Sequence, residues 1–248
     1  MRYFIEIAYN GKNYHGWQIQ PNAITVQEVL EKSLSTLLRK SIKITGAGRT
    51  DAGVHAKQLV AHFDSQKMDA LPLLVHRLNS FLPGDISIKR IVPVKPDAHA
   101  RFDAVSREYQ YVISAEKNPF LQDFAYLLYQ KPDIKRMNEV CETLLDFSNF
   151  QCFSRAHSDV KTYVCNITQA IWEEKENKTL VFTIKADRFL RNMVRAIVGT
   201  LLEVGYAKIS KEDFVAIINS KDRSKAGASA PAHGLYLTSV SYPKNIYK

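Results

Sequence analysis

The alternation of apolar and polar residues predicts an ordered set of strands and helices over the first part of the chain. Residues 3–9 alternate with a period of two and end at an Asn-Gly turn signal, which indicates a strand. Residues 26–40 repeat aliphatic side chains along one helical stripe, which indicates an amphipathic helix. The predicted order is strand, helix, strand, strand, helix, strand, over residues 3–9, 26–40, 42–46, 58–64, 72–81 and 86–94. This order is that of the ferredoxin-like fold.

The second half of the chain repeats the theme with longer connections. Strands are predicted over residues 107–114, 165–172, 180–186 and 236–241, and helices over residues 134–146, 189–204 and 211–219. We place a domain boundary between residues 101 and 102, so that an N-terminal ferredoxin-like domain covers 1–101 and a C-terminal α+β domain covers 102–248. The predicted fold class is α+β, with two ferredoxin-like or RRM-like halves whose antiparallel sheets adjoin around a central cleft.

The net charge of the chain indicates which class of partner it could bind. The chain has 34 Lys and Arg against 25 Asp and Glu, a formal net charge of +9, which favours a polyanion such as nucleic acid. A basic enzyme whose charge only keeps it dispersed remains the alternative. The three cysteines form no CxxC pair, and no apolar run approaches the ~20 residues of a membrane helix. We therefore expect a cytoplasmic protein with no membrane partner.

Residues 46–56, with the sequence GAGRTDAGVHA, form a glycine-rich loop between two predicted strands. Asp51 is its only carboxylate, and Arg49 lies two residues before it. An aspartate beside an arginine stays ionised, which suits nucleophilic or electrostatic work. The alternative is that Asp51 caps a turn and Arg49 is its ion-pair partner at the surface.

Three arginines gather where the helix over residues 189–204 is predicted. Arg188, Arg191 and Arg195 have the spacing i, i+3 and i+7, which places them along one face. A solvated charged stripe is the usual meaning of such spacing. Because this helix is apolar over most of its circumference, we expect at least one arginine beside buried surface, where it needs an anion such as Asp51 or a phosphate.

Tyr109 and Tyr111 lie on the same side of the strand predicted over 107–114, together with Arg107. Aromatic rings on an exposed sheet stack bases in RNA-binding modules of this topology, whereas core tyrosines are an equally good interpretation. Further basic residues could follow a phosphate backbone, although most are expected to be ordinary solvated charge: Lys131, Lys135, Arg136, Arg155, Lys161, Lys221, Arg223 and Lys225.

No metal or cofactor is expected. The seven histidines show no ligand spacing of the HxxxH or HxH kind: His15, His55, His62, His76, His99, His157 and His233. The chain has no Walker loop, and Gly46-Ala47-Gly48 lacks the rest of a GxGxxG pattern.

Four segments make the chain resemble the TruA-type tRNA pseudouridine synthases over nearly its whole length. They are GRTDAGVHA over 48–56, REYQYVI from Arg107, FLRNMVRAIVGTLLEVG from Phe189 and APAHGLYL from Ala230, in the family's order. The resemblance implies an enzyme that isomerises uridine to pseudouridine in the anticodon stem-loop of tRNA, around positions 38 to 40, without a cofactor. It also implies a homodimer in which one tRNA contacts both subunits.

The resemblance also implies roles for individual residues. Asp51 is the catalytic aspartate and Arg195 its ion-pair partner, although both Arg195 and Arg49 could reach it. Tyr109 lies against the target uracil, Leu235 lines the base pocket, and Arg49 helps to extrude the target nucleotide. Asp51 attacks or stabilises C1′ of the ribose, or starts elimination at C2′, and the sequence does not separate these routes.

One departure from the family pattern and two rival functions accompany this interpretation. Cys165 stands where an arginine is typical, which puts one secondary RNA contact in doubt, and we expect it to be a packing cysteine. A noncatalytic RNA-binding or chaperone protein explains the charge but not Asp51, because an anion repels phosphate. A magnesium-dependent hydrolase needs more carboxylates than this loop offers.

Overall fold

The structure is a computed structural model that describes residues 1–155, 160–175 and 178–248, so His157 lies outside the described residues. The chain forms two compact units. Unit 1 comprises Met1–Val105 and Tyr236–Lys248, and unit 2 comprises Ser106–Leu235. Both combine helices with mostly antiparallel strands, which confirms the α+β class. The domain boundary at residues 101 and 102 stays a prediction.

Over residues 2–94, unit 1 has the predicted order of elements, and it also includes the strand predicted over 236–241 in the second half of the chain. Its elements are β1 (Arg2–Tyr9), α1 (Val26–Leu38), β2 (Thr45–Gly46), β3 (His55–Asp64), α2 (Leu71–Phe81), β4 (Ile86–Val94) and β9 (Leu235–Ser241). The first residue of β9, Leu235, belongs to unit 2, and the rest of the strand belongs to unit 1. Strand β1 pairs antiparallel with β3 and β4, and β2 pairs antiparallel with β3. Strand β9 runs parallel to β3 over two residue pairs, so this sheet is not wholly antiparallel.

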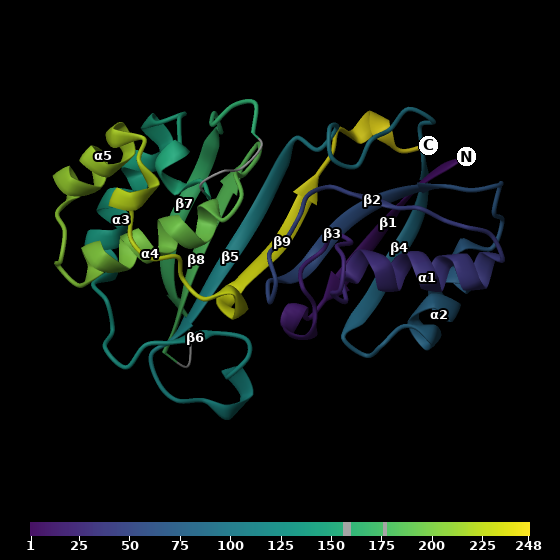
Figure 1. Ribbon diagram of the computed structural model, residues 1–248, viewed down its shortest axis with the longest axis horizontal. Helices are drawn as coiled ribbons and strands as arrows, with labels where there is room; N and C mark the ends of the chain where they lie inside the picture. The colour runs from purple at the N-terminus through teal and green to yellow at the C-terminus, as the bar shows by residue number, and fades with distance from the viewer. Residues whose placement is uncertain (156–159, 176–177) are drawn as a thin grey trace. The chain divides into compact units, whose positions relative to one another are not determined.

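The helices of unit 1 pack on one face of its sheet (Figure 1). Thr25 caps α1, because its hydroxyl oxygen accepts the Glu28 N–H at 3.4 Å. The helix ends at Leu38, two residues before the predicted end, because Arg39 adopts a left-handed φ of 51°. Leu30 and Leu34 bury the apolar stripe of α1 against the sheet.

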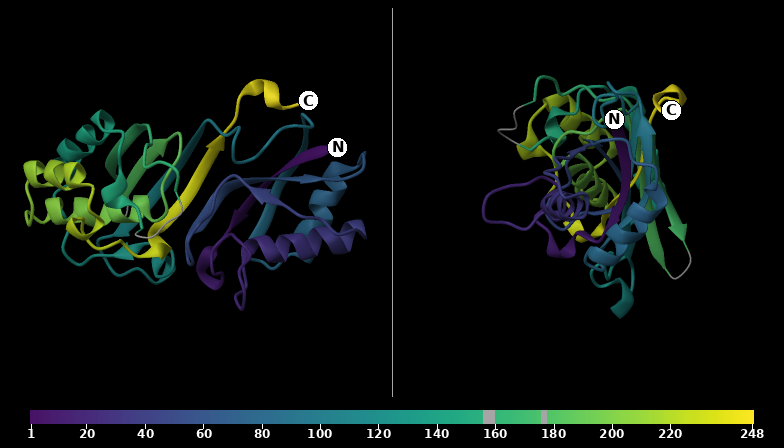
Figure 2. Two further views of the ribbon diagram at one scale, coloured as in Figure 1. Left: turned by 45° about the horizontal axis from the view of Figure 1, so that its top comes forward. Right: turned by 90° about the vertical axis from the view of Figure 1, so that its right-hand side faces the viewer.

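Unit 2 is built on the antiparallel order β5-β8-β7, with the short β6 parallel to β5. Helices α3, α4 and α5 pack together on one face of it, as Figure 1 and, from two further sides, Figure 2 show. The elements are β5 (Ser106–Ser114), β6 (Tyr126–Leu127), α3 (Ile134–Thr143), β7 (Ile167–Lys175), β8 (Thr179–Ala186), α4 (Met193–Gly205) and α5 (Lys211–Ser220). None of the helices among the described residues is long and apolar enough to span a bilayer.

Short 3-10 turns connect these elements. They are η1 (Gly11–Asn13), η2 (Pro119–Leu121), η3 (Leu144–Asp146), η4 (Gln151–Phe153), η5 (Arg223–Lys225), η6 (Ala232–Gly234) and η7 (Lys244–Ile246). The helix predicted over 134–146 ends at Thr143 and continues as η3, because helices often tighten at their last turn.

The helix predicted over residues 189–204 was placed too early. Helix α4 begins at Met193, because Asn192 adopts a left-handed φ of 67° that a continuous helix does not allow. The carbonyl of Arg191 accepts the Arg155 N–H at 3.0 Å instead of a helical partner. Arg188 and Arg191 therefore precede the helix, and the predicted stripe of three arginines on one helical face is wrong.

Candidate active site

The glycine-rich loop of unit 1 connects β2 to β3 and carries Asp51. The Ala47 N–H donates to the Val60 carbonyl at 2.8 Å, which continues the pairing of the two strands by one residue. At the other end, the Val54 N–H donates to the Asp51 carbonyl at 3.2 Å and closes a tight turn. The loop is thus a short, hydrogen-bonded connection in which the half-buried Asp51 is held at the start of a turn.

Tyr9 and Trp17, near the N-terminus, form hydrogen bonds that hold this loop in place. The Trp17 N–H donates to the Thr50 carbonyl at 3.3 Å, and the hydroxyls of Tyr9 and Thr50 share a buried hydrogen bond of 2.8 Å. Gly16 has a φ of +87°, and a Cβ there would lie 2.3 Å from the Thr50 carbonyl oxygen. Only glycine allows the chain to pass this close to the residue that precedes Asp51.

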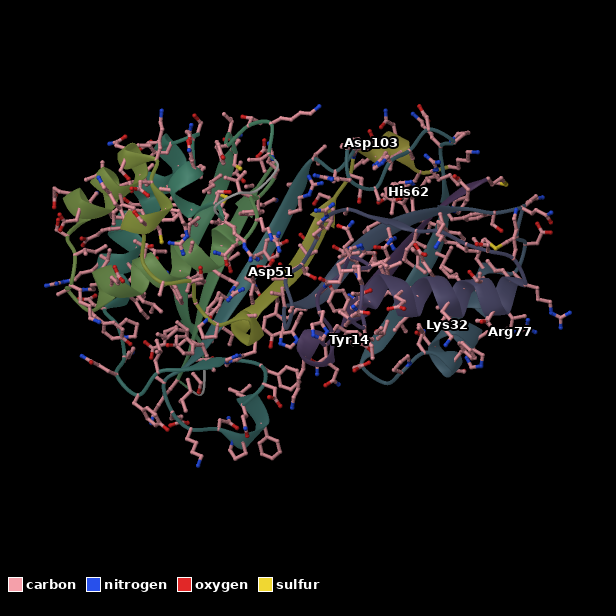
Figure 3. All side chains as sticks on the ribbon, viewed as in Figure 1. Tyr14, Lys32, Asp51, His62, Arg77 and Asp103 are labelled. Atoms are coloured by element: carbon pink, nitrogen blue, oxygen red, sulfur yellow. The ribbon has the colours of Figure 1, made fainter. Side chains whose placement is uncertain are left out.

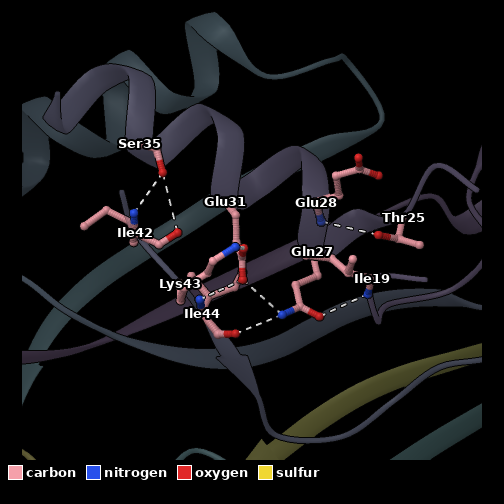
Figure 4. A network of polar contacts seen from close by, with 9 residues as sticks. All are labelled: Ile19, Thr25, Gln27, Glu28, Glu31, Ser35, Ile42, Lys43 and Ile44. Carbon is pink, nitrogen blue, oxygen red and sulfur yellow. Dashed lines mark hydrogen bonds and ion pairs between the residues drawn. The ribbon is translucent and has the colours of Figure 1, made fainter. Parts of the chain in front are cut away.

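The buried carboxylate of Glu31 on α1 binds the residues that lead into β2 and the loop (Figure 4). Glu31 accepts the Ile44 N–H at 3.0 Å, the Gln27 amide at 3.1 Å and the Lys43 ammonium at 2.9 Å. The Gln27 amide also donates to the Ile44 carbonyl at 3.0 Å. A buried charge is tolerated when it is paired and hydrogen-bonded, and here it fixes residues 43 and 44 just before β2.

The residues that follow the loop are equally well packed. The His55 ring accepts the Gly11 N–H on Nδ1 at 3.0 Å and stacks on Tyr236 with 4.7 Å between ring centroids. The Lys57 ammonium lies 5.3 Å from the Tyr236 ring centroid. Burial raises the pKa of the Tyr236 phenol, so it stays neutral. These contacts lie where β3 pairs with β9.

Arg49 and Asp51 share the loop but differ in their surroundings. The Arg49 side chain is exposed, and within the described ranges no ion pair of 4.0 Å or less joins it to Asp51. Figure 3 labels Asp51 and, from the N-terminal residues, Tyr14, whose carbonyl accepts the Gly53 N–H of the loop at 3.3 Å. The loop thus presents an arginine to solvent close to its half-buried aspartate.

The two tyrosines of β5 have different roles in unit 2. Tyr111 is 0% exposed, and its hydroxyl donates to the Pro231 carbonyl at 2.8 Å, while burial raises the pKa of this phenol. Tyr109 is half-buried, and its ring and that of Phe189 form a T-shaped pair with 5.1 Å between centroids. The core interpretation therefore holds for Tyr111, and Tyr109 is the one that a base could contact.

Arg195 lies on α4 and is bound twice to the segment that follows η5. Its Nε donates to the Ala230 carbonyl at 2.7 Å, and the Ala230 N–H donates back to the Arg195 carbonyl at 2.9 Å. One turn later, a Cβ on Gly199 would lie 1.7 Å from the Ala228 carbonyl oxygen. Glycine at this position lets the segment lie directly on the helix.

Leu235 ends this segment and is 6% exposed. It follows η6, whose position is set by the hydrogen bond between Tyr111 and Pro231. Tyr111 is thus a supporting residue, whereas the sequence left base stacking and core packing equally open for it. The spacing of residues 107–114 could not separate the two, because Tyr109 and Tyr111 share one side of the strand.

The predicted site residues therefore fall into two groups. Unit 1 carries Arg49 and Asp51 on one loop, and unit 2 carries Tyr109, Arg195 and Leu235. In the part of the chain that the structure describes, no three His, Cys, Asp or Glu side chains converge as a metal-binding group.

Cys165 is buried in unit 2. Burial raises the pKa of its thiol to about 11, so it is a neutral packing group near pH 7.

A family model described as tRNA pseudouridine synthase matches residues 6–103 and 144–243. These two stretches contain the glycine-rich loop, α4 and β9. The chain therefore belongs to the tRNA pseudouridine synthase family, whose enzymes are isomerases that act on tRNA. This membership argues against both rival functions, the noncatalytic RNA-binding protein and the magnesium-dependent hydrolase.

Within that family the chain is similar to proteins named tRNA pseudouridine synthase A. The protein of that name from Bacteroides thetaiotaomicron is 54% identical over 248 residues, which cover 99% of this chain and 92% of the relative. The Bacteroides fragilis protein is 53% identical over 249 residues, covering 100% and 98%. The more distant Exiguobacterium sibiricum protein is 37% identical over 244 residues, covering 98% of each.

Proposed function

We propose that this chain isomerises uridine to pseudouridine in the anticodon stem-loop of tRNA, around positions 38 to 40, with Asp51 as the catalytic group. The observation that carries the proposal is the placement of Asp51, the loop's only carboxylate, in a turn that is hydrogen-bonded on both sides. Catalysis needs a group held in a fixed geometry, and the Thr50 and Val54 bonds supply that rigidity.

The reaction rearranges one base without net gain or loss of atoms. The bond from ribose C1′ to uracil N1 breaks, the base turns, and a bond from C1′ to C5 forms. The proton on C5 then leaves, and N1 takes up a proton. An ionised Asp51 either attacks C1′, giving a covalent intermediate, or removes the proton at C2′ to start elimination.

The other site residues bind the substrate in this proposal. Arg49 is exposed beside Asp51 and takes the place of the extruded nucleotide, whose unstacking costs a few kcal/mol. Tyr109 lies against the uracil and handles its proton, and Leu235 lines the base pocket. Arg195 is the ion-pair partner of Asp51, with its Nε fixed by the Ala230 carbonyl.

The proposed reaction takes place in the cytoplasm and needs only the protein and its tRNA. We expect no cofactor, because the rearrangement involves no net oxidation or reduction and transfers no group to a second molecule. The enzyme works in the cytoplasm, where its tRNA substrate is found, and its net charge of +9 favours binding of that polyanion.

The test is release of tritium from C5-labelled uridine in unmodified tRNA, with a chelator present. Transcripts in which only position 38, 39 or 40 carries uridine should each release tritium, whereas a transcript with uridine only elsewhere in the stem should not. Release from unrelated positions alone would contradict the site choice. A uridine deuterated at C2′ separates the two routes for Asp51, because only elimination breaks that C–H bond.

A further inference from the structure

A second basic site lies in unit 2, among residues that have no role in the reaction proposed above. Its centre is a cavity with a volume of about 330 Å³. Three cationic side chains line it, those of Arg155, Lys221 and Arg223, together with Gln151 and Tyr163. The cavity thus combines positive charge with polar and aromatic surface, as sites for nucleotides do.

The walls of the cavity are fixed by backbone contacts. Helix α5 ends at Ser220, and the next residue, Lys221, adopts a left-handed φ of 55° and turns the chain toward η5. The Phe150 N–H donates to the Tyr163 carbonyl at 3.1 Å, which brings Tyr163 beside η4. The Arg155 N–H donates to the Arg191 carbonyl at 3.0 Å. Hydrogen bonds therefore fix the backbone positions from which the lining side chains extend.

Arg223 is held in one orientation by three hydrogen bonds. Its Nη1 donates to the carbonyls of Ala226 and Gly227 at 3.2 and 3.1 Å, and its Nη2 donates to the Ser229 hydroxyl at 2.9 Å. A guanidinium has five N–H groups, so these bonds leave two for a ligand. A pre-oriented guanidinium is well suited to bind a phosphate oxygen.

Carboxylates of the described residues offset only part of the positive charge of the cavity. Among the described residues, none lies within 4.0 Å of the side-chain nitrogens of Arg155, Lys221 or Arg223. Asp222 also lines the cavity, but its Oδ1 accepts the N–H and hydroxyl of Ser224 at 2.9 and 2.8 Å. Three cations against this one carboxylate leave the cavity attractive to an anion.

We propose that this cavity binds a backbone phosphate of the tRNA substrate, with Tyr163 and Gln151 contacting the attached nucleoside. This inference rests on the proposed function, which supplies the RNA. The cavity is also linked to the site residues of unit 2, because the Ser229 hydroxyl that binds Arg223 accepts the Asn192 amide at 2.6 Å. The next residue, Ala230, is the one that holds Arg195.

The experiment compares two variants of equal charge. Arg155→Gln/Lys221→Gln removes two exposed cations of the cavity and leaves the bracing Arg223 in place. Lys32→Gln/Arg77→Gln removes two exposed cations from α1 and α2 of unit 1 (Figure 3). For each protein, the Kd for unmodified tRNA is measured over a series of KCl concentrations, and the rate of tritium release is measured at saturating tRNA.

The cavity variant is expected to bind tRNA about tenfold more weakly at low salt, with a slope of log K against log salt that is shallower by about one. Its rate at saturation stays that of the wild type, and the control variant changes neither quantity. Inorganic phosphate, added at constant ionic strength, should compete with tRNA for the wild type and lose that effect in the cavity variant.

Equal Kd and slope for the cavity and control variants would overturn the phosphate site while leaving the proposed function intact. Phosphate binding that depends on the cavity without any change in tRNA affinity would assign the site to a free anion and overturn the RNA assignment. Failure of the proposed function is a separate result, because the wild type would then release no tritium.

Discussion

His62 is a buried histidine in unit 1 that couples stability to pH. Its Nδ1 accepts the Ala100 N–H at 3.1 Å, and its ring lies 4.6 Å from that of His99, measured between centroids. Burial, then the charges of Arg2 and His99, lower its pKa to about 4, against the opposing effects of Asp64 and Asp103. Figure 3 labels His62 and Asp103 in this cluster. The folded protein therefore keeps His62 neutral.

The neutral His62 predicts a loss of stability in mild acid. The unfolded chain takes up a proton near pH 6.5 and the folded chain only near pH 4, so the free energy of unfolding falls as pH drops from about 6.5 to about 4. The loss is at most about 3 kcal/mol. Urea unfolding at pH 7.5 and pH 4.5 should show a smaller loss for His62→Gln than for the wild type.

The control for this prediction is His76→Gln, which removes an exposed histidine from α2. It should keep the wild-type pH dependence. An equal loss of stability in His62→Gln and wild type would show that His62 does not carry the effect. His99, whose pKa burial also lowers, remains in all three proteins.

At the scale of elements, the sequence predicted most strands and helices because their apolar spacing matches their burial. Strand β4 has the bounds predicted for it, and α1 begins at Val26 as predicted. Helix α4 was misplaced because its spacing continues through residues that tertiary hydrogen bonds hold outside the helix, such as Arg191. The periodicity of apolar residues shows which positions share one face of a helix. It does not reveal that a residue such as Asn192 adopts a left-handed φ, so that the helix begins only after it.

The support beneath the Asp51 loop leads to a prediction about two glycines. Gly16→Ala places a Cβ 2.3 Å from the Thr50 carbonyl oxygen at a φ of +87°, so the loop must shift. We expect a loss of about 1–3 kcal/mol in the free energy of unfolding and at least a tenfold lower turnover, since misplacing a catalytic group is costly. Thermal melts and single-turnover tritium release measure the two effects.

Gly48→Ala is the matched control on the loop itself. Among the described residues, a Cβ there meets no atom within 4 Å, so stability should change by less than about 0.5 kcal/mol. If Gly16→Ala keeps wild-type turnover, the contact with Thr50 does not position the loop.

For the molecule as a whole, the sequence motifs predicted the function more specifically than the composition did. The charge of +9 indicated only a polyanion, whereas the order of four motifs indicated the family to which the chain belongs. The residues that brace the site escaped notice, because Glu31 and Gln27 look like surface residues of a helix until their partners near Ile44 are known. Such contacts join residues distant in sequence and leave no local pattern.

The homodimer implied by the resemblance remains a proposal at this scale. Light scattering of the purified protein should give a mass twice the 28.2 kDa of the chain, at micromolar concentration and moderate salt. A mass of one chain under conditions where tritium release is complete would show that the monomer suffices for the reaction.

Single-turnover tritium release by Asp51→Asn is the decisive experiment on the proposed catalytic role of Asp51. Wild type, Asp51→Asn and the surface control Asp69→Asn are compared at tRNA concentrations above the Kd of each. We predict that Asp51→Asn lowers the rate by at least about 10³-fold with a Kd within a few-fold of wild type, and that Asp69→Asn changes neither. Near-normal tritium release by Asp51→Asn would show that Asp51 is not the catalytic group.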